Sequence, residues 1–346
     1  MAKTTIEWAS DTWNPVRGCS KISPGCKNCY AMRHAIRFAK AGQPYHGLVK
    51  STPHGPEWTG LVRPSDSDTL RAPLHWRLPK RIFVNSMSDL FHEDIHDWAI
   101  EKVFAVMALC SRHTFIVLTK RSDRARRWFK ETGDLETREM AVSRAAEHIG
   151  GVVWDARGSD PEKYRGAAEV ANRRAWPGWP LPNVWLMVSV EDQAHAGRVD
   201  DLIKTPAAIR GVSYEPALRP VDFRPWLPVV SVCPKNIPAS DEGRAALADL
   251  AQAAQRFVGR LDWVIVGGES GPGARPFDVR WARSTIEQCK AASVACFVKQ
   301  LGARPFDGLN EDGSPSTETI RFALSDRKGG DPAGWPPDLR VREYPE

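Results

Sequence analysis

Two short apolar stretches, Arg81-Ile-Phe-Val-Asn-Ser86 and Thr114-Phe-Ile-Val-Leu-Thr119, decide the fold. Each has the length of a buried strand and ends in polar residues. Between them, Ile100, Val103 and Phe104 recur with the spacing of one helical face. A strand, a helix and a second strand in this order predict parallel strands joined by a crossover helix.

The same alternation continues along the chain. We expect further strands at residues 6–12, 183–190, 209–213, 262–266 and 295–298, and helices at residues 123–130, 136–149, 241–257 and 280–292. About seven strands with helical crossovers in 346 residues fit one α/β unit better than two domains. The prediction is a single (β/α) barrel, partial or complete, of the TIM-like type.

Three long segments without periodicity interrupt this pattern, at residues 42–80, 131–182 and 216–240. Loops of this length in a barrel serve as lids or binding loops, or are disordered. We assign residues 1–302 to the barrel and its insertions, and residues 303–346 to a polar, Pro-rich, weakly ordered C-terminal extension.

Charge and hydropathy narrow the class of protein. With 48 Lys and Arg against 42 Asp and Glu, the net charge is +6, which allows a polyanionic partner without requiring one. The longest apolar run, residues 104–110, is far shorter than the roughly 20 residues that cross a bilayer. The first residues lack the apolar core of a signal peptide. We therefore expect a cytoplasmic protein with no membrane contact.

The sharpest motif is Cys19-x6-Cys26-x2-Cys29, on one loop that contains Gly and Pro. Three thiolates on such a loop can meet at one centre, and thiolates favour iron–sulfur clusters or zinc over hard cations. A 4Fe-4S cluster on three cysteines keeps one iron open for another ligand. The alternatives are zinc with a fourth ligand from His34, His46 or His54, and three unrelated buried cysteines.

The loop follows the first predicted strand, and in this it resembles the radical S-adenosylmethionine (SAM) enzymes. In that superfamily three cysteines after the first strand hold a 4Fe-4S cluster, and SAM chelates the open iron. The resemblance is incomplete. The superfamily's usual spacing is Cys-x3-Cys-x2-Cys with an aromatic residue before the last cysteine, whereas here the first gap is six and Asn28 takes the aromatic position.

The chain also resembles, over nearly its whole length, the three-cysteine-motif phage and prophage proteins, a family of unknown function. The blocks that carry this resemblance are Thr12-Trp-Asn-Pro-Val-Arg-Gly-Cys19, Ser23-Pro-Gly-Cys-Lys-Asn-Cys-Tyr-Ala31, Phe83-Val-Asn-Ser-Met-Ser-Asp-Leu-Phe-His92, Val117-Leu-Thr-Lys-Arg121, Val188-Ser-Val-Glu-Asp-Gln193 and Val266-Gly-Gly-Glu-Ser-Gly-Pro-Gly-Ala-Arg-Pro276. The resemblance implies a radical-SAM-like protein and no particular reaction.

Polar side chains follow almost every predicted strand, and in a parallel barrel the ends of the strands surround one mouth, where active sites lie. The alternative is that each residue only begins a loop or caps a helix. If the mouth binds SAM, Asp89 would accept from the ammonium, and Ser189 and Glu191 would bind the ribose or the carboxylate. The other expected cofactor-binding residues are Ser88, Glu215, Gly267 and Gly268, and the catalytic candidates are Glu269, Lys299 and Cys233.

Residues 120–130 carry six cations in eleven positions, with Trp128 and Phe129 among them. Cations with stacking aromatic rings are typical of nucleic-acid binding, whereas a solvated helix face that docks its aromatic rings on the barrel is the alternative. The nucleic-acid candidates are Lys120, Arg121, Arg124, Arg126 and Arg127. Arg33, Arg37 and Lys40, near the cysteine loop, add to this charge.

These observations predict an iron–sulfur, radical-SAM-like enzyme that generates a 5′-deoxyadenosyl radical, with DNA, RNA or a nucleotide as its expected substrate and with a reductant as a possible protein partner. Two alternatives remain open. One is a zinc-stabilised nucleic-acid-binding module without catalysis. The other is an iron–sulfur protein that serves a neighbouring enzyme in electron transfer or regulation.

Overall fold

The computed structural model describes residues 4–130, 135–155, 177–228, 260–310, 314–316 and 318–346. Its main element is a sheet of seven strands. These are β1 (Asp11–Trp13), β6 (Arg81–Val84), β7 (Thr114–Thr119), β8 (Val184–Ser189), β9 (Ile209–Tyr214), β10 (Trp263–Gly267) and β12 (Ala295–Gln300). The predicted strands are therefore confirmed to within a few residues, and the N-terminal one lies at 11–13 rather than 6–12.

All neighbouring strands of this sheet are parallel, and they lie in the order β1-β6-β7-β8-β9-β10-β12. This is the order in which the chain forms these seven strands, as expected for successive strand–helix units. The sheet curls into a half-barrel whose two edges within the described residues are β1 and β12. The predicted partial barrel agrees with this sheet.

Alternate side chains of the strands face opposite sides of the sheet. The concave side holds a small core of aromatic and aliphatic residues that includes Trp8, Phe83, Ile116, Met187, Trp263 and Phe297. The convex side carries a larger core beneath the helices, with Ile82, Val84, Phe115, Val117, Val264 and Val266 among its members. Both faces are thus buried, which explains why the strands are nearly continuous apolar runs.

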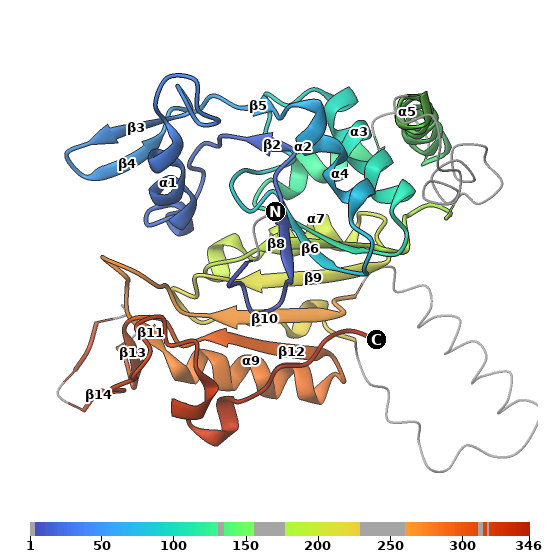
Figure 1. Cartoon of the computed structure of the whole chain (residues 1–346). Helices are drawn as coiled ribbons and strands as arrows, with labels where there is room; N and C mark the ends of the chain where they lie inside the picture. The colour runs from blue at the N-terminus through green and yellow to red at the C-terminus, as the bar shows by residue number, and fades with distance from the viewer. Residues whose placement is uncertain (1–3, 131–134, 156–176, 229–259, 311–313, 317) are drawn as a thin grey trace, which may run out of the picture.

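Helices connect the strands and cover the convex side (Figure 1). They are α2 (Ser67–Arg71), α3 (Asp97–Leu109), α4 (Ser122–Lys130), α5 (Leu135–Asp155), α7 (Arg198–Ile203) and α9 (Val279–Ala291). The expected helices at 123–130, 136–149 and 280–292 are confirmed, and the one at 136–149 continues to Asp155. The helix expected at 241–257 lies outside the described residues.

The insertion at 42–80 is largely ordered by its own contacts. It forms the hairpin of β3 (Val49–Thr52) and β4 (Gly55–Trp58), and β5 (Arg63–Pro64) pairs with β2 (Val16–Arg17). Together with α1 (Tyr30–Ala35), the hairpin encloses a second small core that contains Met32, Tyr45, Leu48, Val49 and Trp58. We call residues 17–63, which contain the cysteine loop, the cysteine lobe.

The C-terminal extension is packed, in contrast to the expected weakly ordered strip. Strands β11 (Phe277–Asp278), β13 (Pro305–Asp307) and β14 (Ile320–Arg321) form a small separate sheet. Farther along, Trp335 and Leu339 are buried, and Arg342 forms an antiparallel bridge with Phe297 of β12. The apolar side chains spaced through this polar segment fix it to the sheet.

Among the described helices, none combines the length and the apolar character that crossing a bilayer requires.

Candidate functional site

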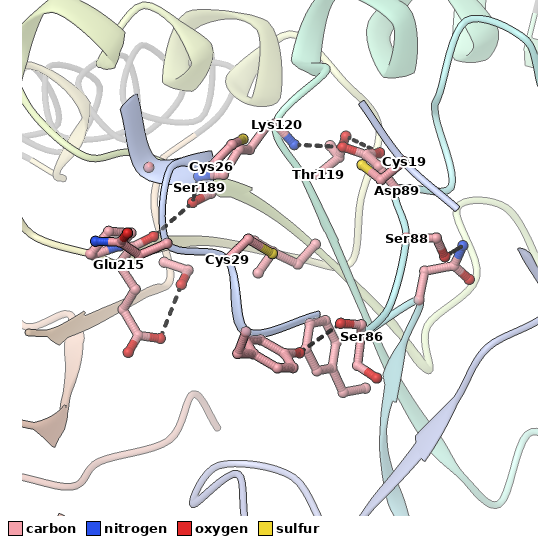
Figure 2. Close-up of a pocket in the computed structure, with 18 of the residues that line it drawn as sticks. Cys19, Cys26, Cys29, Ser86, Ser88, Asp89, Thr119, Lys120, Ser189 and Glu215 are labelled. Atoms are coloured by element: carbon pink, nitrogen blue, oxygen red, sulfur yellow. Dashed lines mark hydrogen bonds between the residues drawn. The ribbon is translucent and has the colours of Figure 1, made fainter. Parts of the chain in front are cut away.

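A single pocket brings together the cysteine loop and the polar ends of the strands (Figure 2). It lies at the carboxyl ends of the parallel strands, and its volume is about 240 Å³. That volume is close to the lower end of the roughly 300–1,000 Å³ of small-molecule sites. Its lining includes all three cysteines of the loop, Cys19, Cys26 and Cys29.

The cysteine loop is held in a defined conformation by short local elements. Gly18, at φ +89°, begins it, and this left-handed conformation favours glycine. A 3₁₀ turn at Pro24–Cys26 follows, and α1 begins directly after Cys29. Backbone N–H groups of Ala31 and Met32 hydrogen-bond the Cys29 thiol.

Glu191 is the first of three carboxylates that hold this loop in place. Its side chain is fully buried and accepts a hydrogen bond from Ser23 Oγ at 2.6 Å. It also pairs with Lys120, and with Arg198 at 2.9 Å. Burial opposes ionisation of Glu191, but Lys120 and Arg198 outweigh it and hold its pKa below the usual value. The ribose or carboxylate contact expected of Glu191 is thus replaced by an anchor beneath the loop.

Glu269 is the second anchor. Arg275 binds its carboxylate through two nitrogens, at 2.7 and 3.0 Å, and Asn28 Nδ2 of the cysteine loop donates to it at 2.9 Å. Arg275 also donates to the carbonyl of Pro24 in the loop at 2.9 Å. Burial raises the pKa of Glu269, but these donors more than offset it, so its pKa is lowered. Glu269, expected as a catalytic candidate, is fully engaged in positioning the loop.

Asp89 is the third carboxylate, and its hydrogen-bonding capacity is filled. It accepts from Phe91 N at 3.1 Å, Thr119 Oγ1 at 2.7 Å, Lys120 N at 3.0 Å and Arg121 Nη1 at 3.1 Å. A carboxylate has about four acceptor sites, so an added ammonium would have to displace one of these donors. The structure therefore argues against the ammonium-binding role expected of Asp89.

Through Asp89, the protein positions Arg121 beside the first cysteine. Arg121 Nη1 lies 3.9 Å from Cys19 Sγ, and Nη2 donates to Ser20 Oγ at 2.7 Å. Ser20 is in turn 2.8 Å from His92 Nε2. A buried guanidinium thus lies against the thiol that the loop presents to the pocket.

Burial raises the pKa of the Cys19 thiol to about 12, and the nearby Asp89 adds to the increase. Burial also raises the pKa of Cys29, against the opposing effect of the N–H groups of α1. Neutral thiols are therefore the stable form of these two side chains on their own. A bound cation would reverse this, because a coordinated thiol loses its proton.

The three cysteines line the same pocket, but in the described residues they are not gathered as the ligands of one metal ion would be. Within the described residues, no three His, Cys, Asp or Glu side chains gather closely enough to hold one metal ion. Zinc needs four donors at about 2.0–2.3 Å from one point. The ligands of a cubane cluster bind different irons and therefore lie farther apart. His34, His46 and His54, the expected fourth zinc ligands, are exposed and do not line the pocket.

The other expected residues divide between the pocket wall and the supporting structure. Ser189 and Glu215 line the pocket, and Ser189 Oγ donates to the Glu215 carbonyl at 3.0 Å (Figure 2). Lys299, also in the wall, pairs with the Glu215 carboxylate at 3.0 Å. Ser88 Oγ donates to the carbonyl of Val16 at 2.7 Å.

Gly267, which ends β10, and Gly268, which follows it, are packed closely against other parts of the protein. A Cβ added at Gly267 would lie 2.6 Å from Glu215 Oε1, and one at Gly268 would lie 2.5 Å from the Leu301 carbonyl. A side chain and a carbonyl of the same chain therefore approach these glycines closely, while Gly268 also lines the pocket, so their contact with a ligand stays a prediction.

Two buried polar atoms in the pocket wall have no partner in the described structure. They are Oδ1 of Asn85 and Nε1 of Trp8, on side chains that are each 2% exposed. Asn85 has φ +60° directly after β6, where Asn is one of the few residues that tolerate this conformation. The pocket wall thus contains one unpaired acceptor and one unpaired donor, both buried within the wall. Asn85 belongs to the strand-end pattern expected at the mouth, although no role was predicted for it, whereas Trp8 was not among the expected residues.

A model described as "Protein of unknown function (DUF5131)" matches residues 3–320. The chain belongs to the DUF5131 family. The comparisons with curated proteins and with solved structures gave no match. The description of DUF5131 assigns no reaction, so the site must be interpreted from its own chemistry.

In this DUF5131 chain, five of the six cations of the basic segment at 120–130 are paired with acidic neighbours. Lys120 pairs with Glu191, Arg121 with Asp89, Arg124 with Asp97, Arg126 with Asp201, and Arg127 with Asp123 and Glu93. Trp128 and Phe129 are at most 2% exposed and pack in the core, so their expected role as a stacking platform is wrong. Cys233, a catalytic candidate, lies outside the described residues.

Proposed function

We propose that the pocket is the cofactor site of an iron–sulfur enzyme of the radical-SAM-like type. Cys19, Cys26 and Cys29 would hold a 4Fe-4S cluster with one iron open to SAM. The observation that supports this proposal is the position of the thiols: one anchored loop presents all three to a pocket at the carboxyl ends of a curled parallel sheet. Active sites of TIM-like barrels lie at that end.

The chain's own residues suit such a group. Arg121, held by Asp89, brings a positive charge to Cys19 and would offset the negative charge of the thiolates. Lys120 also favours the thiolate, because its positive charge lowers the pKa of Cys29. Because Asp89 is saturated, Asn85 Oδ1 is the acceptor that we assign to an N–H group of the bound cofactor, and since this atom is buried in the wall, its side chain would have to turn toward the pocket.

Cluster and SAM together would supply a 5′-deoxyadenosyl radical for hydrogen abstraction. The protein's part is to bind, orient and exclude water. The aromatic floor of Trp8 and Phe83, whose ring centroids are 4.7 Å apart, would keep one side of the pocket dry. The Lys299–Glu215 pair and Ser189 supply polar groups in the wall.

The proposal is tested by purifying the protein anaerobically and measuring iron, sulfide and zinc, followed by EPR spectra of the reduced protein with and without SAM. We expect about four irons per chain and a spectrum that SAM changes. Cys26→Ala should lose the iron signal. Cys110→Ala is the matched control, because Cys110 is a buried thiol in the core outside the pocket and its removal should leave the iron content unchanged.

One zinc per chain without iron would contradict the proposal and favour the zinc-stabilised module. A reducible cluster whose spectrum is insensitive to SAM would instead indicate an electron-transfer or regulatory protein. Equal iron loss in Cys26→Ala and Cys110→Ala would mean that the cysteine loop does not hold the cluster.

A further inference from the structure

The positive charge of the protein is concentrated in the cysteine lobe, residues 17–63. These residues include eight Lys and Arg and one acidic residue, Glu57, which gives a net charge of +7. Since the whole chain carries +6, all the remaining residues together carry −1. The lobe is therefore a cationic unit on an almost neutral body.

Half of these cations form ion pairs or hydrogen bonds within the protein. Arg17 pairs with Asp66 and Lys21 with Glu57, while Arg33 and Arg63 donate to backbone carbonyls. The other half has no hydrogen-bond or ion-pair partner in the described part of the chain. These exposed side chains are Lys27, Arg37, Lys40 and Lys50.

Exposed rings lie among the unpaired cations. Tyr30 is 49% exposed and Phe38 is 42% exposed, although both are large apolar side chains. Tyr30 begins α1, and Phe38 ends the 3₁₀ turn that follows it, so the two rings alternate in sequence with Lys27, Arg37 and Lys40. Cations alternating with exposed rings are the combination that binds single-stranded nucleic acid, because phosphates pair with the cations and bases stack on the rings.

The cysteine lobe borders the pocket. Tyr30 and Trp58 of the lobe are part of the pocket wall, and so is the exposed Ile22. In Figure 1, α1 and the β3–β4 hairpin lie together at the end of the sheet toward which the arrows of β9, β10 and β12 point. A polymer bound along the lobe would therefore pass over the mouth of the pocket.

We propose that the cysteine lobe binds single-stranded nucleic acid and delivers it to the pocket. As a statement about substrate class, the proposal rests on the proposed function, whereas the binding itself requires neither cluster nor SAM. It moves nucleic-acid binding away from residues 120–130, where every basic side chain from Lys120 to Arg127 has an acidic partner, to the unpaired cations of the lobe.

The test is a fluorescence-anisotropy titration of labelled 15-nucleotide DNA and RNA strands of the same mixed sequence, at several salt concentrations, on protein of known iron content. The triple variant R37Q/K40Q/K50Q removes three unpaired charges. We expect the slope of log K against log[salt] to fall by about 2, because each phosphate contact on a single strand contributes about 0.7. Phe38→Ala should weaken binding by about tenfold through lost stacking, with the slope unchanged.

The matched control is R126Q/R127Q, which removes paired cations of α4 and should leave binding unchanged. DNA and RNA arms that differ would identify the natural polymer, and either one supports the proposal. No binding at 50 mM salt would overturn the proposal, and so would an equal loss in the control. Polyglutamate of equal charge serves as the competitor, and equal displacement by it would indicate an acidic protein as the partner and overturn the proposal as well.

The two proposals fail separately. Protein without iron that still binds the oligonucleotide through the lobe would contradict only the proposed function. Protein with a SAM-sensitive cluster and no affinity for either strand would contradict only the nucleic-acid proposal.

Discussion

Glu191 shows how a single buried carboxylate can serve a site without touching a ligand. Its two oxygens bind Ser23, Lys120 and Arg198, and its side chain is fully buried. We predict that Glu191→Gln destabilises the protein by about 2–3 kcal/mol at pH 7, because two partly buried cations lose their partner. Urea unfolding measures the change, and Glu287→Gln, an exposed carboxylate on α9, should change stability by less than about 0.5 kcal/mol.

The stability difference between wild type and Glu191→Gln should also depend on pH in a defined direction. The pKa of Glu191 in the folded protein is lowered from 4.5, so its ionised form stabilises the fold above that value. This stabilisation is lost as the pH falls through the lowered pKa. The difference between wild type and Glu191→Gln should therefore narrow in acid, for example between pH 7 and pH 3. A difference that stays constant over this range would mean that charge pairing is not its cause.

The three carboxylates that follow the strands show what could be predicted from the sequence alone and what could not. The sequence identified Asp89, Glu191 and Glu269 as strand-end carboxylates of the mouth, and the structure confirms that they lie at strand ends. It could not identify their partners, because Ser23 is 168 residues from Glu191 and Asn28 is 241 residues from Glu269. The strand-end pattern predicts position, whereas function depends on which long-range donor each carboxylate meets.

At the scale of elements, the cysteine loop lies directly against Glu191 at Gly25. A Cβ added at Gly25 would overlap Glu191 Oε1 and come within 2.6 Å of its Cγ. We predict that Gly25→Ala displaces the loop, costs about 1–3 kcal/mol of stability and lowers the iron content of anaerobically purified protein. The control is Gly197→Ala, where nothing lies within 4 Å of the added Cβ. Iron content unaffected by Gly25→Ala would show that the loop does not need this close contact.

Most strands and helices were predictable because each is a short apolar run bounded by polar residues. Strand β7 is a run of β-branched and apolar residues, and α3 is apolar over its whole second half, with seven consecutive buried residues from Val103 to Leu109. The cysteine lobe was not predictable as a unit. Its hairpin contains Pro56 and Gly55 and has no alternating pattern, and its small core forms from residues such as Met32 and Trp58 that are far apart in sequence.

At the scale of the whole molecule, the C-terminal residues complete the half-barrel. Val341 and Glu343 hydrogen-bond the backbone of the edge strand β12, which protects this edge from pairing with another chain. Tyr344 then packs in the concave side, with ring centroids 5.5 Å from Trp263 and 5.3 Å from Phe297. The sequence suggested a loose tail here because Pro and charged residues dominate the segment, and the few apolar side chains that fix it follow no period.

This arrangement predicts that one aromatic side chain near the C-terminus supports the inner core. Tyr344→Ala should lower the free energy of unfolding by about 1–3 kcal/mol through lost apolar burial, together with the contact between its ring and Arg81, 3.9 Å from the ring centroid. Tyr344→Phe keeps the ring and gives up only a 3.4 Å hydrogen bond to the Glu7 carbonyl, so it should stay within about 0.5 kcal/mol of wild type. Thermal and urea unfolding of the three proteins measure this. Because Tyr344 does not line the pocket, the iron content should be equal in all three proteins. Equal stability of Tyr344→Ala and Tyr344→Phe would mean that the C-terminal tail does not support the concave core.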